Sequence, residues 1–127
     1  MTFPFNPKKG LVFLKAEITG PGGRARLRFA LDTGATQTLV NAAPLVGIGY
    51  DPALATKHVQ VTTGSGTVYA PVITVTSLGA LGHDRPNFQV LCHTLPPSAT
   101  VDGLLGLDFF RDHVLTLDFQ QGQIELA

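Results

Sequence analysis

A strand-like run leads into a glycine turn at Leu27-Arg28-Phe29-Ala30-Leu31-Asp32-Thr33-Gly34-Ala35-Thr36. Phe29 and Leu31 alternate with Arg28 and Ala30, which is the period-2 pattern of a half-buried strand. A carboxylate at the buried end of such a strand, here Asp32, needs hydrogen-bond partners, because an unpaired charge is costly to bury. Acids in such places are common at functional sites. The structural alternative is a turn in which Asp32 simply accepts hydrogen bonds from the backbone.

A second motif follows about seventy residues later, at Val101-Asp102-Gly103-Leu104-Leu105-Gly106-Leu107-Asp108-Phe109-Phe110. Together, the two stretches resemble the retropepsin-like aspartic peptidases, the single-lobe relatives of pepsin. In that family a strand carries Asp-Thr-Gly-Ala, here Asp32 to Ala35, and an apolar-apolar-Gly element, here Leu104-Leu105-Gly106, packs against it. A glycine-rich hairpin that serves as the flap lies between the motifs, here around Gly64-Ser65-Gly66. The order and spacing hold over about residues 10–126.

Many short runs of strand-forming residues, separated by frequent turns, predict an all-β domain. Strands are expected at residues 11–18, 24–31, 37–40, 57–63, 67–75, 76–81, 88–92, 114–119 and 124–126, with helical turns at 41–46 and 109–112. Asn41 is expected to cap the first helical turn. The loop at 19–23 is predicted to be longer than a two-residue turn, and a polar loop is predicted at 82–86.

The resemblance implies a retropepsin-like closed β-barrel with a flap hairpin and one or two short helices. Such a barrel forms one lobe of a two-fold dimer. The whole chain, residues 1–127, is expected to be one domain, with residues 1–10 as a flexible N-terminal arm.

The activity implied by the resemblance is that of a homodimeric aspartic endopeptidase without a cofactor. One carboxylate activates a water molecule while the other, protonated, polarises the peptide carbonyl. The chain has a single Asp-Thr-Gly, and neither Asp102 nor Asp108 precedes Thr-Gly or Ser-Gly. The second acid is therefore expected from a second copy across a two-fold axis.

The resemblance also assigns roles to individual residues. Asp32, Thr33 and Gly34 form the catalytic motif: Thr33 hydrogen-bonds across the dimer, and the Gly34 N–H supports the carboxylate. An extended peptide is expected between the flap and the floor around Asp32, with side-chain pockets at Val101 and Leu104. The complete set expected to bind substrate is Ala35, Thr36, Thr63, Gly64, Ser65, Gly66, Val101 and Leu104.

Two positions depart from the retroviral members of the family. Those members usually carry an acid directly after Asp-Thr-Gly-Ala and an arginine directly after the glycine of the second motif. Here these positions are Thr36 and Leu107. Both charges are absent, so neither is left unpaired, but the contact that they would make must differ.

Other chemistries have weaker support. A non-catalytic peptide-binding or dimerisation module of the same fold is the main alternative, although the intact Asp32-Thr33-Gly34 argues against it. An unrelated small β-barrel is a further possibility. No two of the four histidines have metal-ligand spacing, and nothing around Cys92 suggests an activated thiol. A phosphoryl-accepting aspartate is set aside because Gly34 stands where a second Asp would be.

The composition is that of a globular domain, with 44% hydrophobic and 14% charged residues. Nine basic and nine acidic residues give a formal net charge of zero, and no basic cluster is apparent, which argues against nucleic acid or an anionic membrane as a partner. A single cysteine, no signal-like leader and no apolar run of membrane-spanning length favour a cytoplasmic location.

Overall fold

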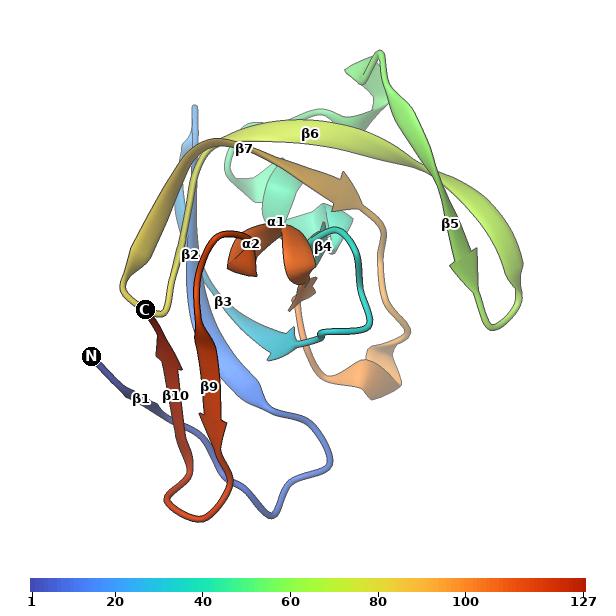
Figure 1. Cartoon of the computed structure of the whole chain (residues 1–127). Coiled ribbons are helices and arrows are strands. Elements are labelled where there is room, and N and C mark those ends of the chain that lie inside the picture. Colours follow the sequence, from blue (N-terminus) through green and yellow to red (C-terminus); the bar gives the residue numbers. More distant parts are fainter.

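Six strands form a closed barrel in the computed structural model, which describes residues 1–62 and 64–127 (Figure 1). Around the ring they are β2 (Phe13–Gly20), β3 (Gly23–Leu31), β8 (Gly103–Leu105), β4 (Leu39–Val40), β7 (His83–Cys92) and β6 (Gly66–Ala80). Antiparallel pairing of β2 with β6, from Ala16↔Ala80 to Thr19↔Ser77, closes the ring. The predicted closed, all-β barrel is therefore confirmed.

The barrel interior is filled by side chains from alternate strand positions. In β2, Leu14, Ala16 and Ile18 are buried, whereas Lys15 between them is exposed. Phe29 from β3 is fully buried in the same core. Burying one such large apolar side chain stabilises the fold by about 1.5–3 kcal/mol. The period-2 pattern that predicts these strands is thus the pattern of contact with the core.

The first hairpin is tighter than predicted. β2 and β3 pair as far as Gly20↔Gly23, so only Pro21 and Gly22 form the loop. The Gly22 N–H donates to the Ile48 carbonyl at 2.8 Å. The prediction of a longer loop at 19–23 was wrong. Glycine and proline favour a loop, but Gly20 and Gly23 still pair with each other as the last residues of the two strands.

β6 is one long strand, although the sequence predicts two at 67–75 and 76–81. Its first half pairs with β5 (His58–Thr63) to form the flap, and its second half pairs with β7. β7 begins at His83, directly after a turn at Leu81 and Gly82, where both residues have positive φ. The polar loop predicted at 82–86 is wrong beyond Gly82, because the polar residues of β7 alternate between its two faces. Asp84 is exposed, whereas His83 and Arg85 are half-buried and hydrogen-bond the carbonyls of Leu126 and Phe109.

The helices are short. α1 (Ala42–Gly47) follows Asn41, whose side chain makes no capping bond; its Oδ1 accepts from Leu95 N–H at 2.9 Å. α2 (Leu107–Phe110) begins two residues earlier than predicted and places Phe109 and Phe110 in the core. Two 3₁₀ turns complete the set, η1 (Pro52–Leu54) and η2 (Pro97–Ala99). None of the helices in the described part of the chain is long and apolar enough to cross a membrane.

A separate three-stranded sheet joins the two ends of the chain. β10 (Gln123–Leu126) pairs with β9 (Leu115–Asp118) on one side and with β1 (Phe3–Pro4) on the other. The termini consequently lie near each other (Figure 1). The sequence predicts a flexible arm for residues 1–10, whereas Phe3 and Pro4 pair with β10 and the Phe5 side chain is buried.

Candidate active site

Asp32 lies where β3 leaves the barrel. Its N–H donates to the Leu105 carbonyl of β8 at 2.9 Å, which anchors the turn to the second motif. Its Oδ1 accepts the Gly34 N–H at 2.9 Å, and its carbonyl accepts the Ala35 N–H at 3.2 Å. The carboxylate is partly buried. These bonds fix the direction of the Asp32 side chain without enclosing it.

The second motif packs directly under this turn. β8 runs parallel to β3 with Ala30 opposite Leu104, and the Leu107 N–H donates to the Ala35 carbonyl at 2.8 Å. The approach is so close that the motif's glycines have no room for a side chain. A Cβ at Gly103 would collide with the Leu39 carbonyl and the Phe29 ring, and one at Gly106 would lie 2.8 Å from the Ala35 carbonyl oxygen.

A buried polar contact, missed from the sequence, locks the two motifs together. Thr38 is fully buried, and its hydroxyl donates to Asp108 Oδ1 at 2.7 Å. The Thr38 N–H donates to both carboxylate oxygens of Asp108, at 3.0 and 2.9 Å. The same hydroxyl accepts the Gly106 N–H at 3.1 Å. This network connects the two motifs in a chain that has Thr36 and Leu107 where retroviral relatives carry charges.

Asp102 has a different structural partner. Its Oδ2 accepts the Arg28 N–H at 3.0 Å, and its own N–H donates to the Arg28 carbonyl at 2.8 Å. The carboxylates of Asp102 and Asp108 therefore both bind backbone N–H groups of their own chain. Neither lines the cleft into which Asp32 opens.

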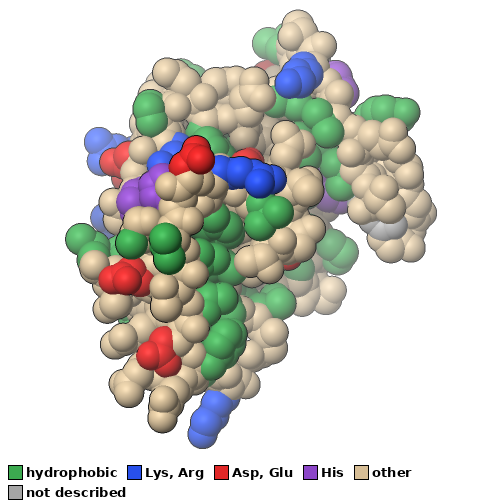
Figure 2. All heavy atoms as spheres, in the orientation of Figure 1, with side chains coloured by type: hydrophobic (Ala, Val, Ile, Leu, Met, Phe, Trp, Pro, Cys, Tyr) green, Lys and Arg blue, Asp and Glu red, His purple; other side chains and the backbone are tan. Residues whose placement is uncertain are grey.

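A cleft of about 1000 Å³ lies between the flap and the body of the barrel. The flap stands away from the body in the space-filling view (Figure 2). Of the residues predicted as site residues, the cleft is lined by Asp32, Gly34, Ala35, Thr36, Gly64, Ser65 and Leu104. Thr33 and Gly66 are exposed but are not among its described lining residues. The side chain of Thr63 lies outside the described residues.

Val101 was expected to form a substrate pocket, and the structure does not support this. Its side chain is 8% exposed, it is not among the described residues that line the cleft, and its carbonyl accepts the Asn41 Nδ2–H at 3.2 Å. Val101 precedes β8 and packs below it, whereas Leu104 within the strand faces the cleft.

The floor of the cleft is a row of leucines from three neighbouring strands. Register pairs Leu104 of β8 with Leu39 of β4, and Leu39 with Leu91 of β7. Leu39 and Leu91 are buried but lie outside the main core, to which the adjacent Val40 and Cys92 belong. Because side chains alternate along a strand, one face of this sheet packs the core and the other faces the cleft.

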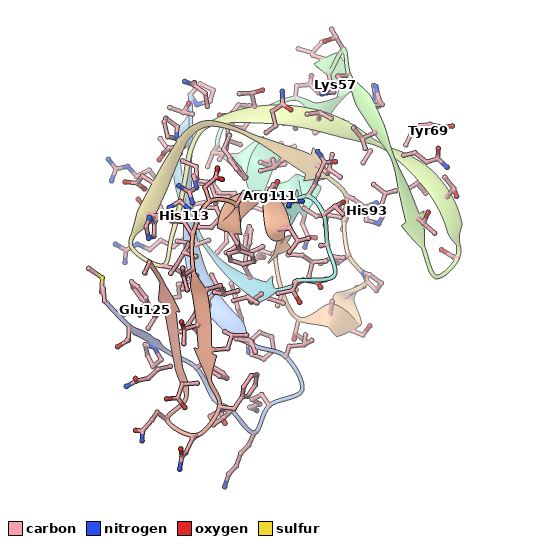
Figure 3. All side chains as sticks on the ribbon, in the orientation of Figure 1. Lys57, Tyr69, His93, Arg111, His113 and Glu125 are labelled. Carbon is pink, nitrogen blue, oxygen red and sulfur yellow. The ribbon has the colours of Figure 1, made fainter. Side chains whose placement is uncertain are left out.

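Thr62 and Val68, at the two ends of the predicted flap, also line the cleft. Several further lining residues were not predicted from the sequence: Gln37, Leu39, Val59, Gln60, Val61, Leu91, His93, Thr94, Leu95, Pro96 and Pro97. His93, which follows Leu91 by two positions, lies between the end of β7 and the flap (Figure 3). The sequence carries no signal that the loop from Thr94 to Pro97 lines the cleft, because the position of this loop depends on where β7 ends.

The other candidate chemistries find little support in the structure. Burial raises the pKa of the Cys92 thiol above its ordinary value of 9.0, which disfavours a reactive thiolate. Cys92 also faces the core rather than the cleft. Among the described residues, no group of three or more His, Cys, Asp or Glu side chains could hold a metal ion.

Comparisons with known proteins point to one family. A family model described as gag-polyprotein putative aspartyl protease matches residues 18–112. Among solved structures, a retropepsin-like aspartic protease from Rickettsia conorii matches with a TM-score of 0.73 and 19% sequence identity, over 99% of this chain and 88% of that one. A search of curated protein sequences found no significant match. At this identity the structural likeness concerns the fold, whereas the family model covers both motifs completely.

Proposed function

This chain belongs to the gag-polyprotein putative aspartyl protease family, and we propose that it is a homodimeric endopeptidase in which Asp32 of two copies hydrolyses peptide bonds. The observation that carries the proposal is the position of Asp32. Its carboxylate is oriented by the Gly34 N–H at 2.9 Å and lines a cleft of about 1000 Å³ between the flap and the barrel. Family and fold are those of aspartic proteases.

The chemistry requires two acids at one place. One Asp32 carboxylate takes a proton from water as the water oxygen attacks the peptide carbonyl carbon, and the other, protonated, donates its proton to the carbonyl oxygen. Collapse of the tetrahedral intermediate breaks the C–N bond, and a carboxyl proton passes to the leaving amine. Because Asp102 and Asp108 bind backbone groups of their own chain, a second copy is the source of the second acid. Retropepsin-like proteases commonly dimerise.

Thr33 and Gly34 have supporting roles in this proposal. Thr33 is exposed on the turn beside Asp32, where it is accessible to a partner copy. Gly34 supplies the N–H that holds Oδ1, and a Cβ at this position would lie 3.1 Å from that oxygen, so a side chain here would require the carboxylate to shift. No cofactor is needed, because all proton transfers use the two carboxylates and water.

The substrate is proposed to be an extended polypeptide that lies between the flap and the leucine floor. Flap residues Gly64 and Ser65 and floor residues Ala35, Thr36 and Leu104 line this space. Edge-to-edge pairing with the flap would add the peptide as a strand. The apolar floor favours substrates with large apolar side chains near the cleaved bond, because burial of such side chains is favourable.

Purified protein incubated with a mixed peptide library tests the proposal, with Asp32→Asn as the matched control. Cleavage by the wild type alone is the expected result, and sequencing the products gives the specificity. Sedimentation at micromolar concentration, with and without a peptide that carries a transition-state-mimicking hydroxyl, tests the dimer. A strict monomer under both conditions contradicts the two-copy dyad.

A catalytically inactive binding module of the same fold is not favoured, because the acid and its glycine brace are intact. Binding of library peptides without cleavage at any pH would instead support that module. We also propose a cytoplasmic location, on the ground that the single cysteine is a buried free thiol. Cell fractionation with an antibody against the chain tests this location.

A further inference from the structure

The outer face of the first hairpin carries an unusual concentration of positive charge. Four of the nine basic residues lie there, alternating with inward-facing apolar residues: Lys15 on β2, and Arg24, Arg26 and Arg28 on β3. The sequence has no run of basic residues and predicts no basic cluster. The cluster forms because the hairpin register places Lys15 opposite Arg28.

Only part of this charge is compensated. Glu17 pairs with Arg26 at 3.3 Å and with Arg24 at 3.7 Å, and the side chains of these two arginines are 88% and 72% exposed. Lys15 and Arg28 have no carboxylate within ion-pair distance among the described residues. Like charges directly opposite each other on paired strands are unfavourable. The barrel itself therefore gains nothing from the juxtaposition of Lys15 and Arg28.

A groove of about 810 Å³ lies beside these cations. Its apolar walls come from the hairpin, from β1 and from the β6–β7 turn, through Phe3, Pro4, Phe13, Leu14, Leu27 and Leu81. Lys15, Arg26 and Arg28 line it as well, together with the single acid Asp102, whose Oδ2 is held by the Arg28 N–H. The groove thus combines apolar surface with a cationic border.

We propose that this groove binds an acidic polypeptide segment whose carboxylates alternate with apolar side chains. Alternate residues of a strand are about 6.6 Å apart, so an extended peptide presents its carboxylates at the same spacing as Arg26 and Arg28. Its apolar side chains would enter the groove beside Phe3 and Pro4. None of the described residues that line this groove lines the cleft at Asp32, so binding here is independent of the proposed hydrolysis.

Nucleic acid fits the groove less well. Sequence-tolerant binding of single strands uses exposed aromatic faces on which bases stack. The aromatic ring next to the cations, Phe13, already has the Arg28 guanidinium 3.7 Å from its centroid. The charge that would meet phosphates is present, but a guanidinium occupies a face of the Phe13 ring, which leaves Phe3 alone among the described lining residues as an aromatic ring for stacking.

Fluorescence anisotropy with a labelled peptide of alternating glutamate and leucine residues tests the proposal, with a counterpart in which glutamine replaces every glutamate. All proteins carry Asp32→Asn so that the probe is not cleaved. We expect saturable binding of the glutamate peptide only, which weakens as salt is raised. Lys15→Gln with Arg28→Gln should weaken binding by about tenfold, since each exposed ion pair contributes up to about fivefold.

The matched control for Lys15→Gln is Lys57→Gln, which removes one positive charge near the start of the flap (Figure 3) and should leave Kd unchanged. Lys15→Gln alone relieves the repulsion between Lys15 and Arg28, so it should not lower Tm. If the variant with Arg28→Gln fails to fold, weaker peptide binding by Lys15→Gln alone tests the proposal. Equal binding of the glutamine peptide, an equal loss in Lys57→Gln, or groove-dependent binding of a single-stranded oligonucleotide in place of the peptide would overturn the proposal.

Discussion

Removal of the Asp108 carboxylate should destabilise the protein and separate the two motifs. In Asp108→Ala, the buried Thr38 loses the acceptor of its N–H and of its hydroxyl. Leaving one buried donor unsatisfied costs about 1–3 kcal/mol. Two donors are affected, and the hydroxyl can reorient more easily than the N–H, so we expect the free energy of unfolding to fall by about 3 kcal/mol.

Urea denaturation followed by circular dichroism measures this change directly. Asp108→Asn, which retains one acceptor oxygen, should lose about half as much stability. Thr38→Val should also be destabilising, because it leaves the Gly106 N–H without its acceptor. In a double-mutant cycle, Thr38→Val and Asp108→Ala should couple by about 1–2 kcal/mol.

The surface acid Glu125 supplies the control. It pairs with the N-terminal amine at 3.6 Å with a side chain that is 42% exposed, so Glu125→Gln should change stability by less than about 0.5 kcal/mol. A loss below about 1 kcal/mol in Asp108→Ala, or simple additivity in the cycle, would refute the view that this contact joins the motifs.

Three further outcomes are expected. Asp32→Asn should abolish peptide cleavage without lowering Tm, because the amide oxygen still accepts the Gly34 N–H; a marked loss of Tm would make Asp32 a structural residue. Gly103→Ala should destabilise the fold by about 1–3 kcal/mol through overpacking, while Gly47→Ala, with open space around it in α1, should stabilise it by about 0.5–1 kcal/mol; similar urea midpoints for the two would contradict the packing argument. Because burial raises the pKa of Cys92, the folded protein should contain less thiolate at pH 8 and react with iodoacetamide at least about tenfold more slowly than the urea-unfolded chain; equal rates would show that the thiol is accessible.

The two motifs and most of the strands could be predicted from the sequence because their signals are local, whereas the closed barrel was implied by the resemblance to a known family. An apolar strand that ends in Asp32-Thr33-Gly34, and an apolar-apolar-Gly element about seventy residues later, are visible without coordinates. Period-2 alternation marks the residues that face the core, since strand geometry alone enforces it. The flap hairpin and the C-terminal hairpin could be predicted in the same way, from the turn residues Gly64-Ser65-Gly66 and Gln121-Gly122.

What local signals could not provide was register between distant strands. The Thr38–Asp108 contact, the leucine floor and the pairing of Lys15 with Arg28 all depend on which residues lie opposite each other after the barrel closes. The sequence pattern also predicted two strands in place of β6 and a loop in place of the first residues of β7. The second error arose because polar residues in a strand are hard to distinguish from those of a loop. The sequence by itself determined where the acid and its supporting glycines stand along the chain. Only the tertiary structure decided what surrounds them, because long-range register is set by how the strands pack together.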